Sequence, residues 1–286
     1  LKTRNTSPEE LAEKMVGRKV LLTIEKKEPK IGNKILTVKN LNHSSKEGVE
    51  MLKNISFSIS EGEILGVAGV AGNGQSELLD ILSGIEKLQS GEIQINQNKV
   101  LPGVKWDPKK VREMGIAHVP EDRQKRGLIL PFYNYENSIL GYQRKEKYSS
   151  GFLLDKNKIL NLFAETAEQF DVRPRDPKIA SSKLSGGNQQ KLVLAREIES
   201  QPKILLIGQP TRGVDIGAIE RIYEDLLRMK ESGAAILLVS VELDEIMSLS
   251  DRIITMNQGK IVGEIMGSEA TEIELGKMMS GLDRAD

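Results

Sequence analysis

Several common features are scarce or missing in this sequence. It contains no cysteine among its 286 residues, which excludes a disulfide scaffold and cysteine-based metal or redox chemistry. It has no excess of charge, because 41 Lys and Arg side chains balance 41 Asp and Glu side chains, so we expect no nucleic-acid partner. No apolar run approaches the roughly 18 residues that span a bilayer, and the first residues lack the apolar core of a signal peptide. We therefore expect a cytoplasmic protein.

What the sequence does contain is an alternation of strand-like and helix-like segments. The run ISFSI alternates apolar and polar residues, as a half-exposed antiparallel strand does, whereas ILGVAG is continuously apolar or small, as in a buried parallel strand. Strands are predicted at residues 35–40, 54–59, 63–69, 115–120, 203–208 and 234–240, with a terminal hairpin turning at 257–260. Apolar residues at helical spacing predict a helix over 159–170. The pattern predicts a parallel α/β core with an inserted helical subdomain over approximately residues 122–196.

A weak internal repeat relates the two ends of the chain. Residues 7–18, SPEELAEKMVGR, align without gaps to residues 271–282, TEIELGKMMSGL. One explanation is chance resemblance between two amphipathic helices. The other is that residues 1–34 are the tail of a preceding copy plus a linker, and that residues 35–286 form one domain, the second half of a tandem protein.

The segment GVAGNGQS has the pattern of a phosphate-binding loop, G-x-x-x-x-G-K-[ST], except that Gln75 stands at the lysine position. Backbone N–H groups at the start of the following helix would form an anion site whatever residue 75 is. Loss of a charged hydrogen bond would weaken triphosphate binding about tenfold to a hundredfold. A tight turn that needs glycine and binds nothing is the alternative. The candidate nucleotide-binding residues are Gly69, Val70, Ala71, Gly72, Asn73, Gly74, Gln75 and Ser76.

The most specific segment is LSGGNQQKLVLAREI, residues 184–198. A serine at a helix N-cap position, two glycines and an amphipathic helix aim a hydroxyl and free N–H groups at an anion. This segment resembles the signature motif of ATP-binding-cassette (ABC) ATPases, in the form typical of importers for simple sugars and nucleosides. The resemblance extends over residues 35–282 and implies a P-loop ABC nucleotide-binding domain with an antiparallel β subdomain. The signature residues are Ser185, Gly186, Gly187, Asn188 and Gln189.

Besides Gln75, the sequence departs from the pattern of the family at several other positions. HVPEDRQKRGL resembles the Q-loop region, with Glu121 in place of glutamine, and KILLIGQPTRGVD resembles the Walker B strand, with Gly208 and Gln209 in place of its two carboxylates. Val241 stands at the switch-histidine position. Gln209 cannot accept a proton from water at neutral pH, and general-base catalysis is typically worth about 10²–10⁴ in rate. We therefore assign no catalytic residue and expect that this nucleotide site does not hydrolyse ATP at a useful rate.

Other implications of the resemblance concern ligands and partners. ATP or ADP would bind with Mg²⁺, which would retain Ser76 as a weak ligand. Since paired cassettes share their ATP sites head to tail, the signature and the D-loop residues Gly213, Val214 and Asp215 would face the ATP of an amino-terminal cassette in the same polypeptide. Transmembrane permease subunits would hold the assembly at the inner face of the membrane. An adenine-stacking aromatic is missing, and His43, the one conceivable substitute, is expected in a solvated loop.

The aromatic-rich residues 127–142, GLILPFYNYENSILGY, admit two interpretations: core of the helical subdomain, or part of a groove that receives a coupling helix from the permease. Two alternative functions also stay open. One is a nucleotide-free interaction domain with the cassette fold. The other is a soluble ABC ATPase outside transport, which would favour a basic surface or a coiled-coil insertion.

Overall fold

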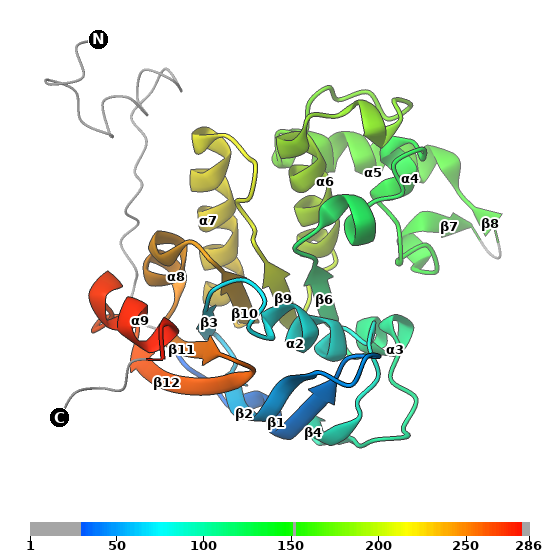
Figure 1. Ribbon diagram of the computed structural model, residues 1–286. Helices are drawn as coiled ribbons and strands as arrows, with labels where there is room; N and C mark the ends of the chain where they lie inside the picture. Colours follow the sequence, from blue (N-terminus) through cyan, green and yellow to red (C-terminus); the bar gives the residue numbers. More distant parts are fainter. Residues whose placement is uncertain (1–29, 151–152, 282–286) are drawn as a thin grey trace, which may run out of the picture.

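The computed structural model describes residues 30–150 and 153–281, and its centre is a six-stranded sheet (Figure 1). The strand order is β12-β11-β3-β10-β9-β6, and all neighbours are parallel except β11 and β12. The strands are β3 (Ile64–Ala68), β6 (Ile116–Val119), β9 (Ile204–Gly208), β10 (Ala235–Ser240), β11 (Arg252–Asn257) and β12 (Lys260–Met266). The apolar runs in the sequence therefore predicted this sheet correctly.

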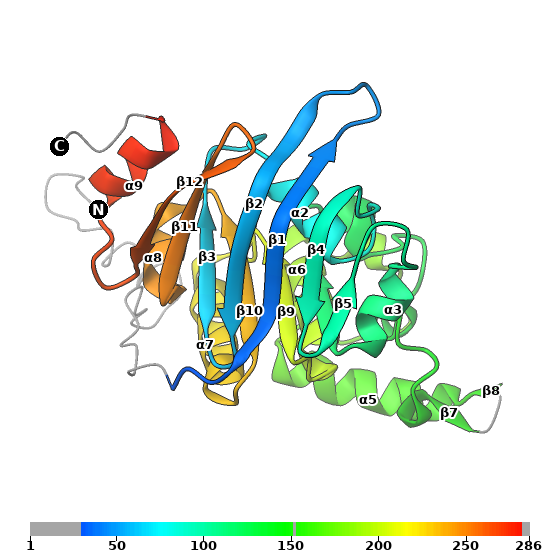
Figure 2. The ribbon, with the colours of Figure 1, turned by 90° about the horizontal axis from the view of Figure 1, so that it is seen from below.

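A second, antiparallel sheet lies over one face of the first (Figure 2). Its order is β2-β1-β4-β5, with β1 (Lys34–Ser44), β2 (Glu50–Ser60), β4 (Ser90–Ile95) and β5 (Asn98–Val100). The first two strands were predicted, although they are longer than expected. The short strands β4 and β5 were not predicted, because SGEIQI has only two alternating apolar residues, Ile93 and Ile95, and NKV has only one.

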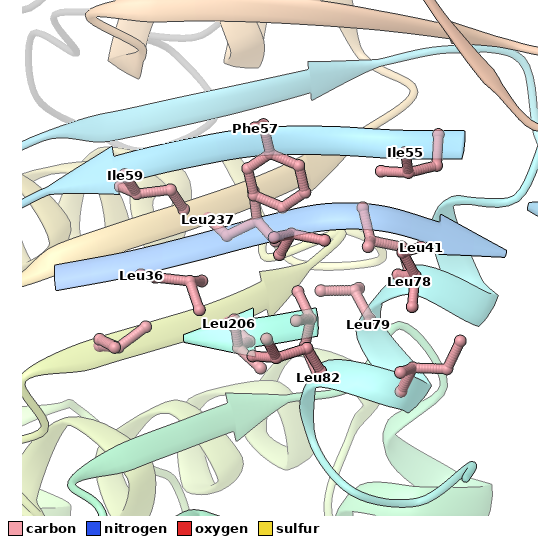
Figure 3. Close-up of a cluster of buried hydrophobic side chains, with 14 of the residues drawn as sticks. Leu36, Leu41, Ile55, Phe57, Ile59, Leu78, Leu79, Leu82, Leu206 and Leu237 are labelled. Atoms are coloured by element: carbon pink, nitrogen blue, oxygen red, sulfur yellow. The ribbon is translucent and has the colours of Figure 1, made fainter. Parts of the chain in front are cut away.

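Helix α2 (Gln75–Leu82) lies between the two sheets and joins their cores. Leu78, Leu79 and Leu82 are almost fully buried against Leu206 and Leu237 of the parallel sheet (Figure 3). Each such side chain contributes about 1.5–3 kcal/mol of burial free energy. The position of this helix fixes the phosphate-loop segment that precedes it.

The other face of the parallel sheet is covered by helices. These are α6 (Gly186–Glu199), α7 (Ile216–Glu231), α8 (Leu243–Leu249) and, beyond β12, α9 (Glu272–Met279). Helix α9 falls within the second copy of the internal repeat; the first copy, residues 7–18, lies outside the described residues.

Most of the helical region follows β6. It contains a π-helix at Arg123–Gly127, α4 (Asn134–Asn137), the hairpin β7 (Ser149–Ser150) with β8 (Leu153–Leu154), and α5 (Lys156–Gln169). Helix α3 (Pro108–Glu113) lies outside this region, because it precedes β6. Short 3-10 turns lie at Glu146–Tyr148 and Ser181–Lys183. The predicted helix over 159–170 is largely α5, and its spaced apolar residues Ile159, Phe163 and Ala167 are buried.

The aromatic-rich residues 127–142 divide into an inner and an outer set. Tyr142 and Ile139 are buried in a small core of the helical region, and the Tyr142 hydroxyl lies 2.5 Å from Oε2 of Glu197. Phe132 and Tyr133 are 43% and 45% exposed. The segment therefore supplies both core and apolar surface.

The expectation for His43 was wrong. This residue belongs to β1, pairs with Leu52 of β2 and is buried rather than solvated. The β1–β2 hairpin extends beyond the predicted strands, which encloses a polar residue that sequence alone places next to a turn. Within residues 30–150 and 153–281, no helix has both the length and the apolarity to cross a membrane.

A buried ion pair ties the ends of three elements together. Lys230 at the end of α7 places Nζ 2.5 Å from Oδ1 of Asp251, and the other carboxylate oxygen accepts a hydrogen bond from the Ile64 N–H at 2.9 Å. Both side chains are nearly buried, at 6% and 5% exposure. The pair thus connects α7 to the starts of β3 and β11.

We expect Lys230→Met to lower the free energy of unfolding by about 3–5 kcal/mol, because it leaves the Asp251 carboxylate buried without its cation. Urea denaturation measures this loss. Lys109→Met, which removes one partner of the exposed Lys109–Glu113 pair, is the matched control and should stay within about 0.5 kcal/mol. A loss below about 1 kcal/mol for Lys230→Met would show that the pair is structurally dispensable.

Candidate functional site

The carboxyl ends of four parallel strands meet at one edge of the sheet. The chain leaves β3 into the phosphate-loop segment, β6 toward Glu121, β9 into Gln209 and β10 into Val241. These segments surround a cavity of about 830 Å³. Its lining includes Gly69, Ala71, Gly72, Gln75, Ser76, Glu121, Gln209, Thr211, Val241 and Glu245. The structure therefore brings most of the predicted nucleotide-binding residues to one place, whereas Val70, Asn73 and Gly74 of the phosphate loop do not line the cavity.

The Gln75 side chain forms hydrogen bonds with the backbone of the phosphate loop. Its Oε1 accepts a hydrogen bond from the Asn73 N–H, and its Nε2 donates to the Val70 carbonyl, both at 3.1 Å. The side chain is only 5% exposed. An anion entering the loop must therefore compete with the Gln75 amide for the Asn73 N–H, whereas a lysine would add a positive charge.

Gly74 is required for the loop geometry. It forms the N-cap of α2 with φ of 103°, in the left-handed region. A Cβ atom at this position would lie 2.7 Å from both the Leu52 side chain and the Met51 carbonyl. Glycine is therefore needed for both backbone conformation and close packing, and the N-terminus of α2 points its N–H groups toward the cavity.

Gln209 and Val241, the two positions that carry catalytic groups in the family pattern, contact each other. The Val241 N–H donates a weak hydrogen bond of 3.5 Å to Oε1 of Gln209. Gln209 is buried and its backbone is left-handed, with φ of 51°. The arrangement offers hydrogen bonds to a ligand but no group that takes up a proton at neutral pH.

Glu245 is a buried acid in the wall of the same cavity, and sequence reasoning did not identify it. It is 1% exposed, and the hydroxyls of Ser240 and Thr211 lie near its carboxylate. Burial raises its pKa to about 6, against a smaller opposing influence of the Ser240 and Thr211 hydroxyls. Burial also raises the pKa of the nearby Tyr223. The signal in the sequence was an acidic residue on the inward face of a short amphipathic helix.

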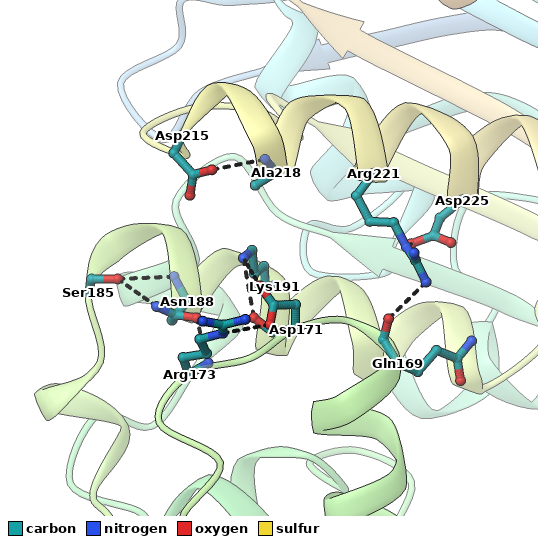
Figure 4. Close-up of polar contacts among 10 residues, drawn as sticks. All are labelled: Gln169, Asp171, Arg173, Ser185, Asn188, Lys191, Asp215, Ala218, Arg221 and Asp225. Carbon is teal, nitrogen blue, oxygen red and sulfur yellow. Dashed lines mark hydrogen bonds and ion pairs between the residues drawn. The ribbon is translucent and has the colours of Figure 1, made fainter. Parts of the chain in front are cut away.

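The signature and D-loop residues lie side by side at the surface (Figure 4). Ser185 is the N-cap of α6 and accepts hydrogen bonds from the N–H and the side-chain amide of Asn188, at 3.4 and 2.9 Å. Asp215 is the N-cap of α7 and accepts from the Ala218 N–H at 3.0 Å. Ser185 and Asp215 are both exposed. The capped N-termini of α6 and α7 therefore lie at the same surface.

The signature and D-loop backbones lie close together, since a Cβ at Gly187 would lie 3.6 Å from the Val214 Cα, an ordinary contact distance. Glycine at 186 leaves room for the Arg123 guanidinium, because a Cβ there would lie 2.5 Å from its Nη2. Gln189 differs from the other signature residues, because it is buried and its side chain donates to the Ser181 carbonyl at 3.1 Å. It therefore supports the loop from inside.

Residues 121–127, here called the Q-segment, connect the cavity to that surface. Arg123 donates to the Arg212 carbonyl at 2.8 Å, and Gln124 donates to Oε1 of Gln189 at 3.1 Å. Arg126 pairs with Asp80 of α2. The sequence shows a charged run here but gives no sign of these partners, which are distant in the chain.

Comparison with protein families matches residues 52–212 to the family described as ABC transporter. This range is more than half of the chain. The chain belongs to the ABC transporter family. Proteins of this family contain ATP-binding domains, and the resemblance inferred from the signature segment is thereby confirmed.

The chain is similar to curated proteins that are named as import ATP-binding proteins. It is 41% identical over 281 residues to the guanosine import ATP-binding protein NupO of Bacillus subtilis, covering 98% of this chain and 54% of that protein. It is 42% identical over 273 residues to the nucleoside import ATP-binding protein NupA of Lactococcus lactis, covering 96% and 53%. The glucose import ATP-binding protein TsgD13 of Haloferax volcanii is 37% identical over 281 residues, covering 98% and 50%. This ABC chain spans about half the length of the curated relatives it matches.

Solved ABC cassettes share the fold. The dimeric post-hydrolysis structure of the ATP-binding cassette MJ0796, bound to ADP and Pi, superposes with a TM-score of 0.69 at 26% identity. The match covers 81% of this chain and 98% of that one. The predicted P-loop ABC fold is therefore confirmed.

The raised pKa of Glu245 predicts a dependence of cassette stability on pH. The folded protein holds the proton up to pH about 6, whereas the unfolded chain releases it near the ordinary value of 4.5. Stability from this group is therefore complete below 4.5 and is lost as the pH rises through 6. We expect Glu245→Gln to be more stable than the native protein by about 2 kcal/mol at pH 8, with the difference vanishing near pH 4.

Urea unfolding at both pH values measures this difference. Glu242→Gln, which changes an exposed acid at the N-cap of the same helix, should show no comparable pH-dependent gain. A constant stability difference for Glu245→Gln between pH 4 and pH 8 would contradict the interpretation.

Proposed function

We propose that this chain is the second cassette of a tandem ABC importer ATPase, with a nucleotide site of its own that does not hydrolyse ATP. The proposal is carried by one asymmetry. The segments that would serve a partner cassette, Ser185–Gly187 and residues 213–215, match the family pattern and lie together, with Ser185, Gly213 and Asp215 exposed. The segments that serve the cassette's own site have lost the carboxylates at 208 and 209 and the histidine at 241.

The residues of the cassette's own site fit a site that would bind a nucleotide without hydrolysing it. Backbone N–H groups of residues 70–76 at the start of α2 would hold phosphate oxygens, and the side chain of Gln75 would offer a neutral N–H. Mg²⁺ and ATP or ADP would bind with oxygen ligands that include Ser76, since Mg²⁺ in such sites takes one or two protein ligands and phosphate oxygens. Binding would be weaker than in a cassette with the loop lysine.

The partner would be an amino-terminal cassette in the same polypeptide, which agrees with relatives about twice as long. The capped N-terminus of α6 would place Ser185 and the Gly186 and Gly187 N–H groups against the γ-phosphate held by that partner. The exposed Phe132 and Tyr133 would contact a permease subunit at the cytoplasmic face of the membrane. Two relatives are named for guanosine or nucleoside import, so a nucleoside is the proposed cargo and a simple sugar the alternative.

A nucleotide-free interaction domain is the second candidate function. It is favoured by the hydrogen bonds of Gln75, which already engage the Asn73 N–H inside the phosphate loop. In that case the cassette would retain only its surface roles toward the partner cassette and the permease.

We expect the chain to bind ATP with a dissociation constant in the micromolar to millimolar range and to release phosphate at well under about 1 s⁻¹. Calorimetric titration with ATP and a coupled phosphate-release assay measure the two quantities. Gln75→Lys should tighten ATP binding about tenfold or more, because it adds a charged hydrogen bond. Absence of binding at millimolar ATP in both proteins would favour the interaction domain, and release at ordinary enzyme rates would refute the non-hydrolytic site.

In a polypeptide that carries both cassettes, Ser185→Glu should lower steady-state ATP hydrolysis about a hundredfold, because a carboxylate replaces a hydroxyl facing the partner's γ-phosphate. Ser182→Glu is the matched control, since Ser182 is exposed three residues earlier and its side chain lies outside the signature. Equal hydrolysis by the two variants would contradict the assignment of residues 185–187 to the partner's site.

A further inference from the structure

Strand β12 forms an outer edge of the six-stranded sheet, as Figure 2 shows. It pairs with β11 on one side. Within residues 30–150 and 153–281, the backbone of residues 261–265 has no hydrogen-bond partner outside β11. An open edge of this kind is a template for one further strand.

The open edge also exposes apolar side chains. Val262 and Met266 lie on one face of β12 and are 44% and 45% exposed. Helix α9 covers the other face, where a Cβ at Gly263 would lie 2.6 Å from the Met278 sulfur. A strand added at this edge would therefore gain both backbone hydrogen bonds and apolar contacts.

Residues 20–25, VLLTIE, have the composition of such a strand. Val, Ile and Thr favour strands, and Val20, Leu22 and Ile24 fall on one face at a spacing of two. Pro29 lies a few residues later and lacks the N–H group that a continuing strand needs. The segment therefore has the length and the apolar face that the edge of β12 requires.

The described chain begins within reach of this edge. A Cβ at Gly62, just before β3, would lie 2.8 Å from the Lys30 carbonyl oxygen. Met266 pairs with the start of β11, which pairs with the start of β3. A position beyond β12 lies three strand spacings from β3, or about 14 Å. Five extended residues span at most about 18 Å, so the chain before Lys30 is long enough to reach the Met266 end of the edge.

We propose that residues 20–25 form a strand that adds to the open edge of β12 and runs parallel to it. The direction follows from the entry point, because residue 25 would lie at the end where β12 itself finishes. The apolar face of the segment would cover Val262 and Met266. The added strand goes beyond the proposed function and does not depend on nucleotide binding. In a longer polypeptide it would fix where a preceding domain attaches.

Charge supports this occupant of the edge. Basic residues flank the segment on both sides, and residues 18–27 contain one acid, Glu25. Residues 260–274 instead carry one lysine and four exposed acids, of which Glu264 also pairs with Arg252. The flanking bases are Arg18, Lys19, Lys26 and Lys27, and the acids are Glu264, Glu269, Glu272 and Glu274. Opposite charges on the two partners favour their association.

Disulfide trapping tests the proposal, because the chain contains no cysteine of its own. Leu22→Cys is combined in turn with Val262→Cys, Glu264→Cys and Met266→Cys, which sample three registers on one face. We expect at least one pair to cross-link within a single chain under mild oxidation, since paired strands bring Cα atoms into disulfide range. Leu22→Cys with Lys109→Cys is the matched control and should stay reduced, because α3 lies at the opposite side of the molecule (Figure 2).

Hydrogen exchange gives a second readout without introduced cysteines. One of two adjacent N–H groups in a strand must point to β12, so Leu21→Pro with Leu22→Pro should prevent pairing. The β12 amides that do not bond to β11 should then exchange about tenfold or more faster than in the native chain. Thr3→Pro with Arg4→Pro, outside the segment, should leave these rates unchanged.

The absence of all three cross-links, or equal exchange rates in the native chain and the Leu21→Pro, Leu22→Pro variant, would overturn the proposal. A cross-link between two chains rather than within one would show that the edge receives a second copy, which also contradicts the assignment to the chain's own segment. None of these results bears on ATP binding, so failure of the added strand and failure of the proposed nucleotide site are distinguishable.

Discussion

The parallel register of four strands is the constraint on which the site depends. Val239 of β10 stands opposite Val67 on one side and Gly208 on the other, and Val119 of β6 stands opposite Ile207. Because parallel strands end at a common edge, the segments that follow them must share one cavity. A shift of one residue in any pairing would turn buried residues outward and separate the phosphate loop from its neighbours.

Sequence predicted the features that depend on apolar runs and on local motifs. The continuous runs at 203–208 and 234–240 gave buried strands, and SGG before an amphipathic helix gave a capped α6. It did not predict β4, β5 or the burial of His43, because these depend on pairing between strands rather than on local periodicity. The sequence also did not predict that Glu121 contacts Ser76 or that it fills the space beside Gly208, because these residues are far apart in the chain.

The cavity and the exposed loops have opposite chemical characters. The cavity contains the buried, protonatable Glu245, and the side-chain amides of Gln75 and Gln209 both form hydrogen bonds with neighbouring backbone groups. The surface at Ser185 and Asp215 instead presents capped helix N-termini to solvent. One cassette therefore combines an enclosed polar cavity with an exposed surface at which two capped helix N-termini lie.

The Q-segment, residues 121–127, extends from the cavity to the surface at Ser185 and Asp215. Glu121 touches the phosphate loop, and two residues later the Arg123 guanidinium packs against Gly186 and holds the Arg212 carbonyl. The segment therefore gives a continuous path of contacts from the phosphate loop to the signature and D-loop surface. If a ligand in the cavity displaces Glu121 and Arg123 together, thermodynamic linkage requires that whatever docks on that surface changes the affinity for the ligand by the same factor.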